Sequence, residues 1–173
     1  MTNPPRGAGL ARRVTAALGR LLTPRSPHTS TVPESTGRGS YPGDWTGLLD
    51  PVYDPKPDGR PDPGEVVWTW VPYEEDHSQG KDRPVLLVGR DGPWLLALQL
   101  TSQDHDRDAA QEARAGRIWV DIGTGAWDTR GRPSEVRVNR VIRVDPGAVR
   151  REGAVLSSAR FDEVAAAVRS ATA

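Results

Sequence analysis

The chain has 173 residues, of which 23 are basic and 23 acidic, so its formal net charge at pH 7 is zero. A neutral protein has no overall field that gathers nucleic acid, so a polyanionic partner must be held by a local cluster of basic side chains. The lack of cysteine excludes disulfides, thiolate zinc sites and cysteine nucleophiles, and it agrees with a cytoplasmic location. Three scattered histidines (His28, His77 and His105) leave little for a histidine-based metal site. No apolar run approaches the roughly 18 residues that a membrane span needs.

Residues 1–40 differ in composition from the rest of the chain. They hold six arginines and one acid, and they are rich in Pro, Gly, Ser and Thr. Five of their apolar residues recur at helical spacing, with arginines on the other side: Leu10, Val14, Ala17, Leu18 and Leu21. We interpret the segment as a basic tail with a nascent helix; the alternative is an amphipathic helix that lies on a membrane surface or docks on a partner. Arginines and glycines interrupt the apolar run that a secretory signal requires.

A proline-rich lead-in follows over residues 41–63. It contains six prolines, a density that disfavours helices and sheet ladders alike. Its larger apolar side chains are expected to hold part of it against the domain that begins at residue 64: Trp45, Leu48, Leu49 and Tyr53.

Residues 64–173 have the pattern of strands followed by one helix. We expect strands at 65–71, 84–89, 93–101, 117–122 and 134–144, a candidate strand at 153–157 and a helix near 159–171. The helix presents one apolar face: Phe161, Val164, Ala165 and Val168. Five or six short strands and a terminal helix predict a mainly β fold, a small, strongly bent, SH3-like barrel.

Turn signals divide these strands. Gly80 permits a tight polar turn through Lys81, Asp82 and Arg83, and Pro84 suits the first position of the strand that follows. Asp91-Gly92 marks a hairpin between the strands at 84–89 and 93–101.

The strand at 134–144 carries the densest positive charge. Its alternation places Val136 and Val138 inward, with Arg137 and Asn139 facing outward together. Residues 130–151 contain seven arginines and two acids, a net charge of +5. This excess is either a local footprint for a polyanion or an ordinary solvated strand face.

Three other segments are candidate sites. Thr101 is the last residue of a strand, where a hydroxyl normally makes a local hydrogen bond at the strand end. The acids of DHDRD (104–108) alternate with Arg107, which is typical of a solvated loop rather than a metal site. GTGAWDTRGR (123–132) lacks the strand–loop–helix frame of a phosphate loop, and Trp127 within it is suited either to stacking on an unpaired base or to capping the barrel. We predict no metal and no cofactor.

Three motifs together resemble a known family. GEVVWTWVPYEEDHSQGKDRPVLLVG (64–89) has a polar loop that ends in Gly-Lys-x-Arg-Pro before an apolar strand. The strand ending LQLTSQ (98–103) and the strand EVRVNRVIRV (135–144), followed by a C-terminal helix, complete the pattern. Residues 64–170 thus resemble the MazF/PemK toxins, and residues 1–50 form an N-terminal extension without a counterpart in the minimal family.

The resemblance implies a homodimer of SH3-like barrels that cuts single-stranded RNA without a metal ion and is restrained by a cognate antitoxin. In this chemistry the RNA supplies its own nucleophile, the 2′-hydroxyl. The expected products are a 2′,3′-cyclic phosphate and a 5′-hydroxyl.

The resemblance also implies roles for individual residues. Arg83 aligns with the catalytic arginine of the Arg-Pro motif, Thr101 with the active-site threonine, Arg137 with a late-strand arginine that contacts phosphate, and His77 with a loop histidine. The residues expected to bind RNA are Lys81, Ser78, Gln79, Ser102, Gln103, Trp127, Arg130, Arg132, Asn139 and Arg140.

Two positions differ from the family pattern. Ser78 stands where a glutamate is common, and Asn139 stands where some members have an aspartate. The general base is therefore expected to be His77, a perturbed neighbouring group or a solvent relay, and His77 is the first candidate because imidazole is the side-chain type suited to proton transfer near neutral pH. The alternative function is a non-catalytic module that binds RNA or protein, since toxins that bind DNA gyrase share this fold.

Overall fold

The computed structural model describes residues 41–102 and 114–171, all within one compact unit, Arg38–Ala173. The helix predicted within residues 1–40, the loop 104–108 and the RNA-binding candidate Gln103 lie outside these described residues.

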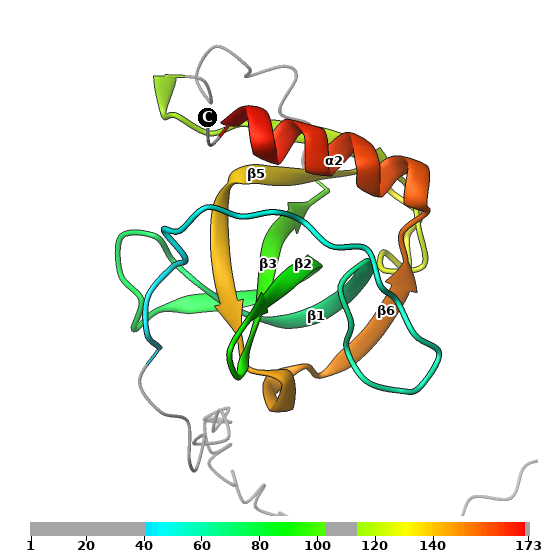
Figure 1. Ribbon diagram of the computed structural model, residues 1–173, viewed down its shortest axis with the longest axis horizontal. Helices are drawn as coiled ribbons and strands as arrows, with labels where there is room; N and C mark the ends of the chain where they lie inside the picture. Colours follow the sequence, from blue (N-terminus) through cyan, green and yellow to red (C-terminus); the bar gives the residue numbers. More distant parts are fainter. Residues whose placement is uncertain (1–40, 103–113, 172–173) are drawn as a thin grey trace, which may run out of the picture. The chain divides into compact units, whose positions relative to one another are not determined.

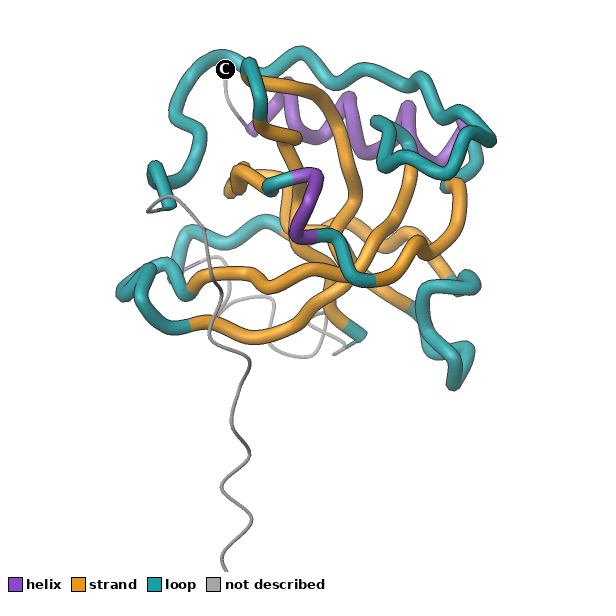
Figure 2. The backbone as a smooth tube through the Cα atoms, turned by 90° about the horizontal axis from the view of Figure 1, so that it is seen from below, coloured by secondary structure: helices purple, strands orange, loops and turns teal. Residues whose placement is uncertain are grey.

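Six strands form one antiparallel sheet in the order β4-β5-β3-β2-β1-β6. The strands are β1 (Glu65–Pro72), β2 (Gly80–Asp91), β3 (Trp94–Thr101), β4 (Trp119–Gly123), β5 (Ser134–Val144) and β6 (Arg151–Val155). A short 3-10 helix, η2 (Pro146–Ala148), precedes β6, and α2 (Ser158–Ala171) ends the described chain. Figure 1 shows α2 lying along β5, and Figure 2 shows the strongly curved strands from below. The predicted fold, a mainly β barrel with a C-terminal helix, is confirmed.

The start of β2 differs from the prediction. Lys81, Asp82 and Arg83 were expected in a turn, but they pair with β1 as part of β2. The ladder from β2 to β3 begins only at Val85, so residues 80–84 have a partner on one side alone. Pro84 is tolerated there because a proline disrupts least where a strand is paired on one side only.

Alternating side chains divide the core between the two faces of the sheet. The larger cluster packs under α2 and contains Val66, Leu98, Val136 and the predicted helix face, which includes Phe161. A smaller cluster occupies the other face and contains Val67, Val71, Val85, Leu87, Leu95, Ala97, Ile142 and Val144. Because successive strand residues point to opposite faces, membership of a cluster fixes where each polar neighbour lies.

The lead-in is attached to the barrel by backbone hydrogen bonds and by buried side chains. Trp45 N donates to Val141 O at 2.8 Å, Val52 N donates to Val88 O at 2.9 Å, and Tyr53 Oη donates to Leu156 O at 2.8 Å. Leu49 is buried, as predicted, but Leu48 is 85% exposed and does not hold the segment. Figure 1 shows the lead-in crossing from β5 towards β6.

Phe161 is the largest fully buried side chain and its ring lies 5.1 Å from that of Tyr53 in the lead-in. We expect Phe161→Ala to lower the free energy of unfolding by about 3–5 kcal/mol, because it leaves a cavity between helix and sheet. Urea denaturation followed by tryptophan fluorescence measures this. Val155→Ala, at an exposed position, serves as the control and should change stability by less than ~0.5 kcal/mol. Equal losses in both variants would contradict the packing assigned to Phe161.

Candidate functional site

A group of polar side chains lies at one end of the sheet face that carries the smaller core cluster. Val85 of β2 is paired with Gln99 of β3. Arg83 lies two residues before Val85 and Thr101 lies two residues after Gln99, which is the same direction in space because the strands are antiparallel. Residues two apart share a face, so Arg83 and Thr101 project on the same side as this pair. Arg137 joins them, because it alternates on β5 with Val136 and Val138, which point into the larger cluster. The fold thus places three of the four predicted catalytic residues on one face.

Arg83 is a half-buried cation that has no counter-ion in the described part of the chain. Among residues 41–102 and 114–171 its guanidinium makes no side-chain hydrogen bond and no ion pair. Burial lowers the pKa of Arg83; the nearby Tyr73 raises it, and Arg140 lowers it further. An arginine remains charged despite such a shift, so this group is available to an anion that brings planar oxygen acceptors.

Arg137 is buried rather than outward-facing as predicted. It is 6% exposed, and its Nη1 and Nη2 donate to the two carboxylate oxygens of Glu74 at 2.8 and 3.2 Å. Its Nε donates to Asn139 Oδ1 at 3.3 Å, so the two side chains do share a face. The hydrogen bond from Arg137 lowers the pKa of Glu74 below its ordinary value. Glu74 was not predicted as a site residue. The available signal was the acidic run Glu74-Glu75-Asp76, which faces an arginine-rich strand.

The loop between β1 and β2 is organised around Asp76. This carboxylate accepts hydrogen bonds from Ser78 N at 3.0 Å, from Ser78 Oγ at 2.6 Å and from Gln79 Nε2 at 2.6 Å. Tyr73 N donates to Gln79 O at 2.8 Å and closes the loop. Ser78 and Gln79, both predicted to bind RNA, are exposed but use these polar groups to stabilise the loop.

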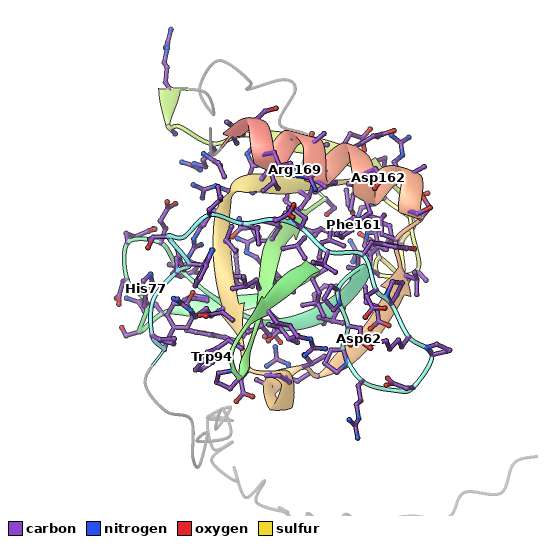
Figure 3. All side chains as sticks on the ribbon, in the orientation of Figure 1. Asp62, His77, Trp94, Phe161, Asp162 and Arg169 are labelled. Carbon is purple, nitrogen blue, oxygen red and sulfur yellow. The ribbon has the colours of Figure 1, made fainter. Side chains whose placement is uncertain are left out.

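His77 lies in the same loop, exposed and close to the lead-in. Its Nε2 is 4.0 Å from Asp44 Oδ1, and the ring of Tyr41 meets the imidazole edge-on at 5.0 Å between centroids. Figure 3 shows His77 on the side of the molecule opposite Asp62. Asp44 and Tyr41 were not anticipated as site residues, since both precede the domain that the motifs define.

Arg140 does not project to solvent as an RNA contact would. It is 7% exposed, and its Nε donates to Asp44 Oδ2 at 2.7 Å. Its remaining groups donate to Asp44 Oδ1, to Pro72 O and to Gln99 Oε1. The prediction that Arg140 binds RNA is therefore corrected, because the guanidinium is buried and its donors have intramolecular acceptors.

Two further RNA-binding candidates have structural roles. Trp127 is 3% exposed and its Nε1 donates to Ser134 Oγ at 3.0 Å, so it caps the barrel and has no open face for a base. Asn139 accepts from Ile118 N at 3.2 Å and donates to Gly116 O, which ties the segment before β4 to β5.

The arginine-rich segment 130–151 is largely neutralised. Five of its seven arginines pair with acids: Arg132 with Asp128, Arg137 with Glu74, Arg140 with Asp44, Arg143 with Asp91 and Arg150 with Asp82. All five of these acids lie outside the segment, so the net charge counted along residues 130–151 overstates the positive field of this region in the folded protein. Arg130 is exposed, as are Lys81 on β2 and Arg132, and Ser102 just after β3 is half-buried.

Within the part of the chain that the structure describes, no group of three or more His, Cys, Asp or Glu side chains is arranged to hold a metal ion. None of the described helices is long and apolar enough to cross a bilayer.

Comparison with known proteins identifies a family. A family model for the PemK-like, MazF-like toxin of type II toxin–antitoxin systems matches residues 62–172. A search of the curated proteins found no relative. Among solved structures, the Mycobacterium tuberculosis toxin MazF-mt6 matches with 16% identity and a TM-score of 0.41, covering 62% of this chain and 94% of that one. MazE–MazF (Form II) from Deinococcus radiodurans matches with 20% identity and a TM-score of 0.45, covering 65% of this chain and 96% of that one.

The Glu74–Arg137 pair makes a testable contribution to stability. Because the folded state lowers the pKa of Glu74 from its ordinary value of 4.5, the ionised carboxylate stabilises the fold above that pH. We expect Glu74→Gln to lower the free energy of unfolding at pH 7 by no more than ~1 kcal/mol, since the carboxylate is partly solvated. The difference from wild type should shrink as the pH falls through the lowered pKa.

Urea denaturation between pH 7 and pH 3 measures this difference. Glu75→Gln removes the neighbouring acid of the same loop, which is exposed, and serves as the matched control. A stability difference for Glu74→Gln that does not change with pH would contradict the pairing.

Proposed function

Because the chain belongs to the PemK-like, MazF-like toxin family of type II toxin–antitoxin systems, we propose that it is an endoribonuclease that cleaves single-stranded RNA without a metal ion. The state of Arg83 carries this proposal. It is a half-buried cation with no counter-ion among the described residues, and it lies on the sheet face that also carries Thr101. A phosphodiester fits such a position, because its non-bridging oxygens accept charge-assisted hydrogen bonds from a guanidinium.

The proposed reaction needs no external nucleophile. The 2′-hydroxyl loses its proton to His77 and its oxygen attacks the adjacent phosphorus. The bond from phosphorus to the 5′-oxygen breaks, that oxygen takes up a proton from water, and His77 returns its proton to the solvent. Arg83 stabilises the negative charge that develops on the phosphoryl oxygens, and Thr101 contributes its hydroxyl to the same group. The products are a 2′,3′-cyclic phosphate and a 5′-hydroxyl.

The proposed role of Arg137 depends on the position of Glu74, its partner in the structure. Its guanidinium is engaged in two places by Glu74, so it reaches a phosphate only when the Glu74 side chain moves aside. The Glu74 side chain is 54% exposed, which leaves room for that movement.

The exposed cations Lys81, Arg130 and Arg132 are proposed to attract the RNA backbone, an interaction that weakens as salt rises. The proposal also includes a homodimer, a cognate antitoxin as partner, and action in the cytoplasm.

Cleavage in the presence of EDTA tests the proposal. We expect the full chain to cut a long single-stranded RNA when EDTA is present, because the reaction is assigned to protein side chains alone. Gel analysis should show fragments whose 3′ ends carry a cyclic phosphate and whose 5′ ends accept phosphate from a kinase without prior dephosphorylation. Binding of the RNA without cleavage would favour the alternative, a non-catalytic binding module.

Arg83→Ala tests the residue on which the proposal rests. We expect the rate of cleavage to fall about 100- to 1000-fold, the loss typical of removing one donor that stabilises transition-state charge. Arg83→Lys keeps a cation but not the two-pronged donor, so it should recover only part of the rate. Arg160→Ala on α2, which removes an exposed arginine paired with Glu163, is the control for the loss of a positive charge. Unchanged cleavage by a folded Arg83→Ala variant would exclude this role.

A further inference from the structure

The segment Tyr41–Trp45 precedes the family match, which begins at residue 62, yet it is fastened to the candidate site. Trp45 N donates to Val141 O at 2.8 Å. Arg143 Nη1 donates to Gly43 O at 2.8 Å and to Asp44 O at 3.1 Å, and the Arg143 guanidinium lies 5.1 Å from the centre of the Trp45 ring. These contacts to β5 fix the backbone on both sides of Asp44.

The carboxylate of Asp44 is held by two partners. Arg140 donates to it from Nε at 2.7 Å and from Nη2 at 3.3 Å, and Tyr41 Oη donates to Oδ1 at 2.5 Å. Arg140 also donates to Pro72 O at 2.9 Å. Pro72 is the last residue of β1, so Asp44 acts through Arg140 on the residue from which the β1–β2 loop departs.

The tip of that loop meets the same lead-in segment. Asp44 is the acid that approaches the His77 imidazole, at 4.0 Å, and Tyr41 packs edge-on against the ring. Figure 1 shows the loop between β1 and β2 on the same side of the barrel as the start of the described lead-in. The root and the tip of the loop are thus both in contact with Tyr41 and Asp44, directly or through Arg140.

We propose that Asp44 is a positioning residue of the RNA-cleaving site, supplied by the lead-in rather than by the family domain. Through Arg140 it fixes the root of the β1–β2 loop, and together with Tyr41 it holds His77 in place. This rests on the proposed function, in which His77 takes a proton from the RNA. Asp44 thereby brings a carboxylate to the β1–β2 loop from outside the residues that the family model matches.

Steady-state cleavage by the full chain tests the positioning. We expect Asp44→Asn to lower kcat about 10- to 100-fold, the range expected when a catalytic group is misplaced, and to change KM little. Asp50→Asn is the matched control, because Asp50 lies in the same lead-in and its partner among the described residues is the exposed Arg169 of α2. Asp44→Glu retains a carboxylate and should recover part of kcat. In a His77→Ala background the effect of Asp44→Asn should largely disappear, because both changes act on one group.

A second measurement does not require cleavage. Amide hydrogen exchange reports on the loop through the Tyr73 N–H, which is bonded to Gln79 O, and the Gln79 N–H, which is bonded to Asp76 O. Both amides should exchange faster in Asp44→Asn than in wild type and in Asp50→Asn. If the wild-type chain cleaves no RNA, this measurement still decides whether Asp44 positions the loop, so the two proposals fail separately.

Two results would overturn the inference: unchanged exchange in the loop of Asp44→Asn, or cleavage faster than wild type, which would make the lead-in an obstacle to RNA. Should Asp44→Asn unfold, Tyr41→Phe removes one hydrogen bond from Asp44 and leaves the pair with Arg140 intact. It should change kcat and loop exchange in the same direction by smaller amounts, and the absence of both changes would equally contradict the proposal.

Discussion

Buried guanidinium groups on β5 determine how the candidate site is assembled. Arg137 and Arg140 are almost inaccessible to solvent, and a buried charge is more stable with a partner of opposite sign than without one. Each is therefore matched by a carboxylate from another part of the chain, Glu74 from the β1–β2 loop and Asp44 from the lead-in. The sheet fixes the arginines, so the pairing fixes the two irregular segments that carry the acids.

Arg83 differs from Arg137 and Arg140 in its charge pairing. It lies on the same sheet face and is half-buried, yet none of the described acids pairs with it. Asp44 neutralises Arg140, which otherwise adds a second uncompensated cation close to Arg83. Among the described arginines of this sheet face, Arg83 is thereby the half-buried one without an acidic partner, and its guanidinium is available to a phosphate on the face that also carries Thr101.

Much of the barrel was predictable because its strands and helix have regular hydrophobic patterns. The apolar face of α2 agrees residue by residue, and the hairpin signal Asp91-Gly92 lies where Asp91 pairs with Trp94 and Gly92 adopts a positive φ of 56°. The alternation of β5 also sufficed to place Arg137 and Asn139 on one face, whereas Arg83, which was expected in a turn, lies within β2. In these cases the residue pattern within one element or turn is enough to predict the local structure.

The charge partners were not predictable in this way, since they are distant in sequence. Glu74 and Arg137 are separated by 63 residues, and Asp44 and Arg140 by 96. A charge count over a stretch of sequence such as residues 130–151 treats these arginines as unpaired. Strand alternation identifies the face on which a side chain lies, but it does not distinguish an exposed position from one covered by a loop. Trp127 shows the same limit for an aromatic side chain, because its burial depends on the way the segment before β5 folds back onto the barrel.

For the proposed RNA substrate, the different states of Arg83 and Arg137 imply an order of binding. A phosphate gains an interaction at Arg83 without breaking another, whereas at Arg137 it must replace the carboxylate of Glu74. That replacement exchanges one anion for another on the same two guanidinium nitrogens, so the net electrostatic gain is smaller than at Arg83. In the proposed reaction a phosphodiester therefore engages Arg83 first, and contact with Arg137 depends on movement of the Glu74 side chain, which belongs to the β1–β2 loop. Because this loop also carries His77, the contacts that hold it in place control both the second phosphate contact and the proposed base.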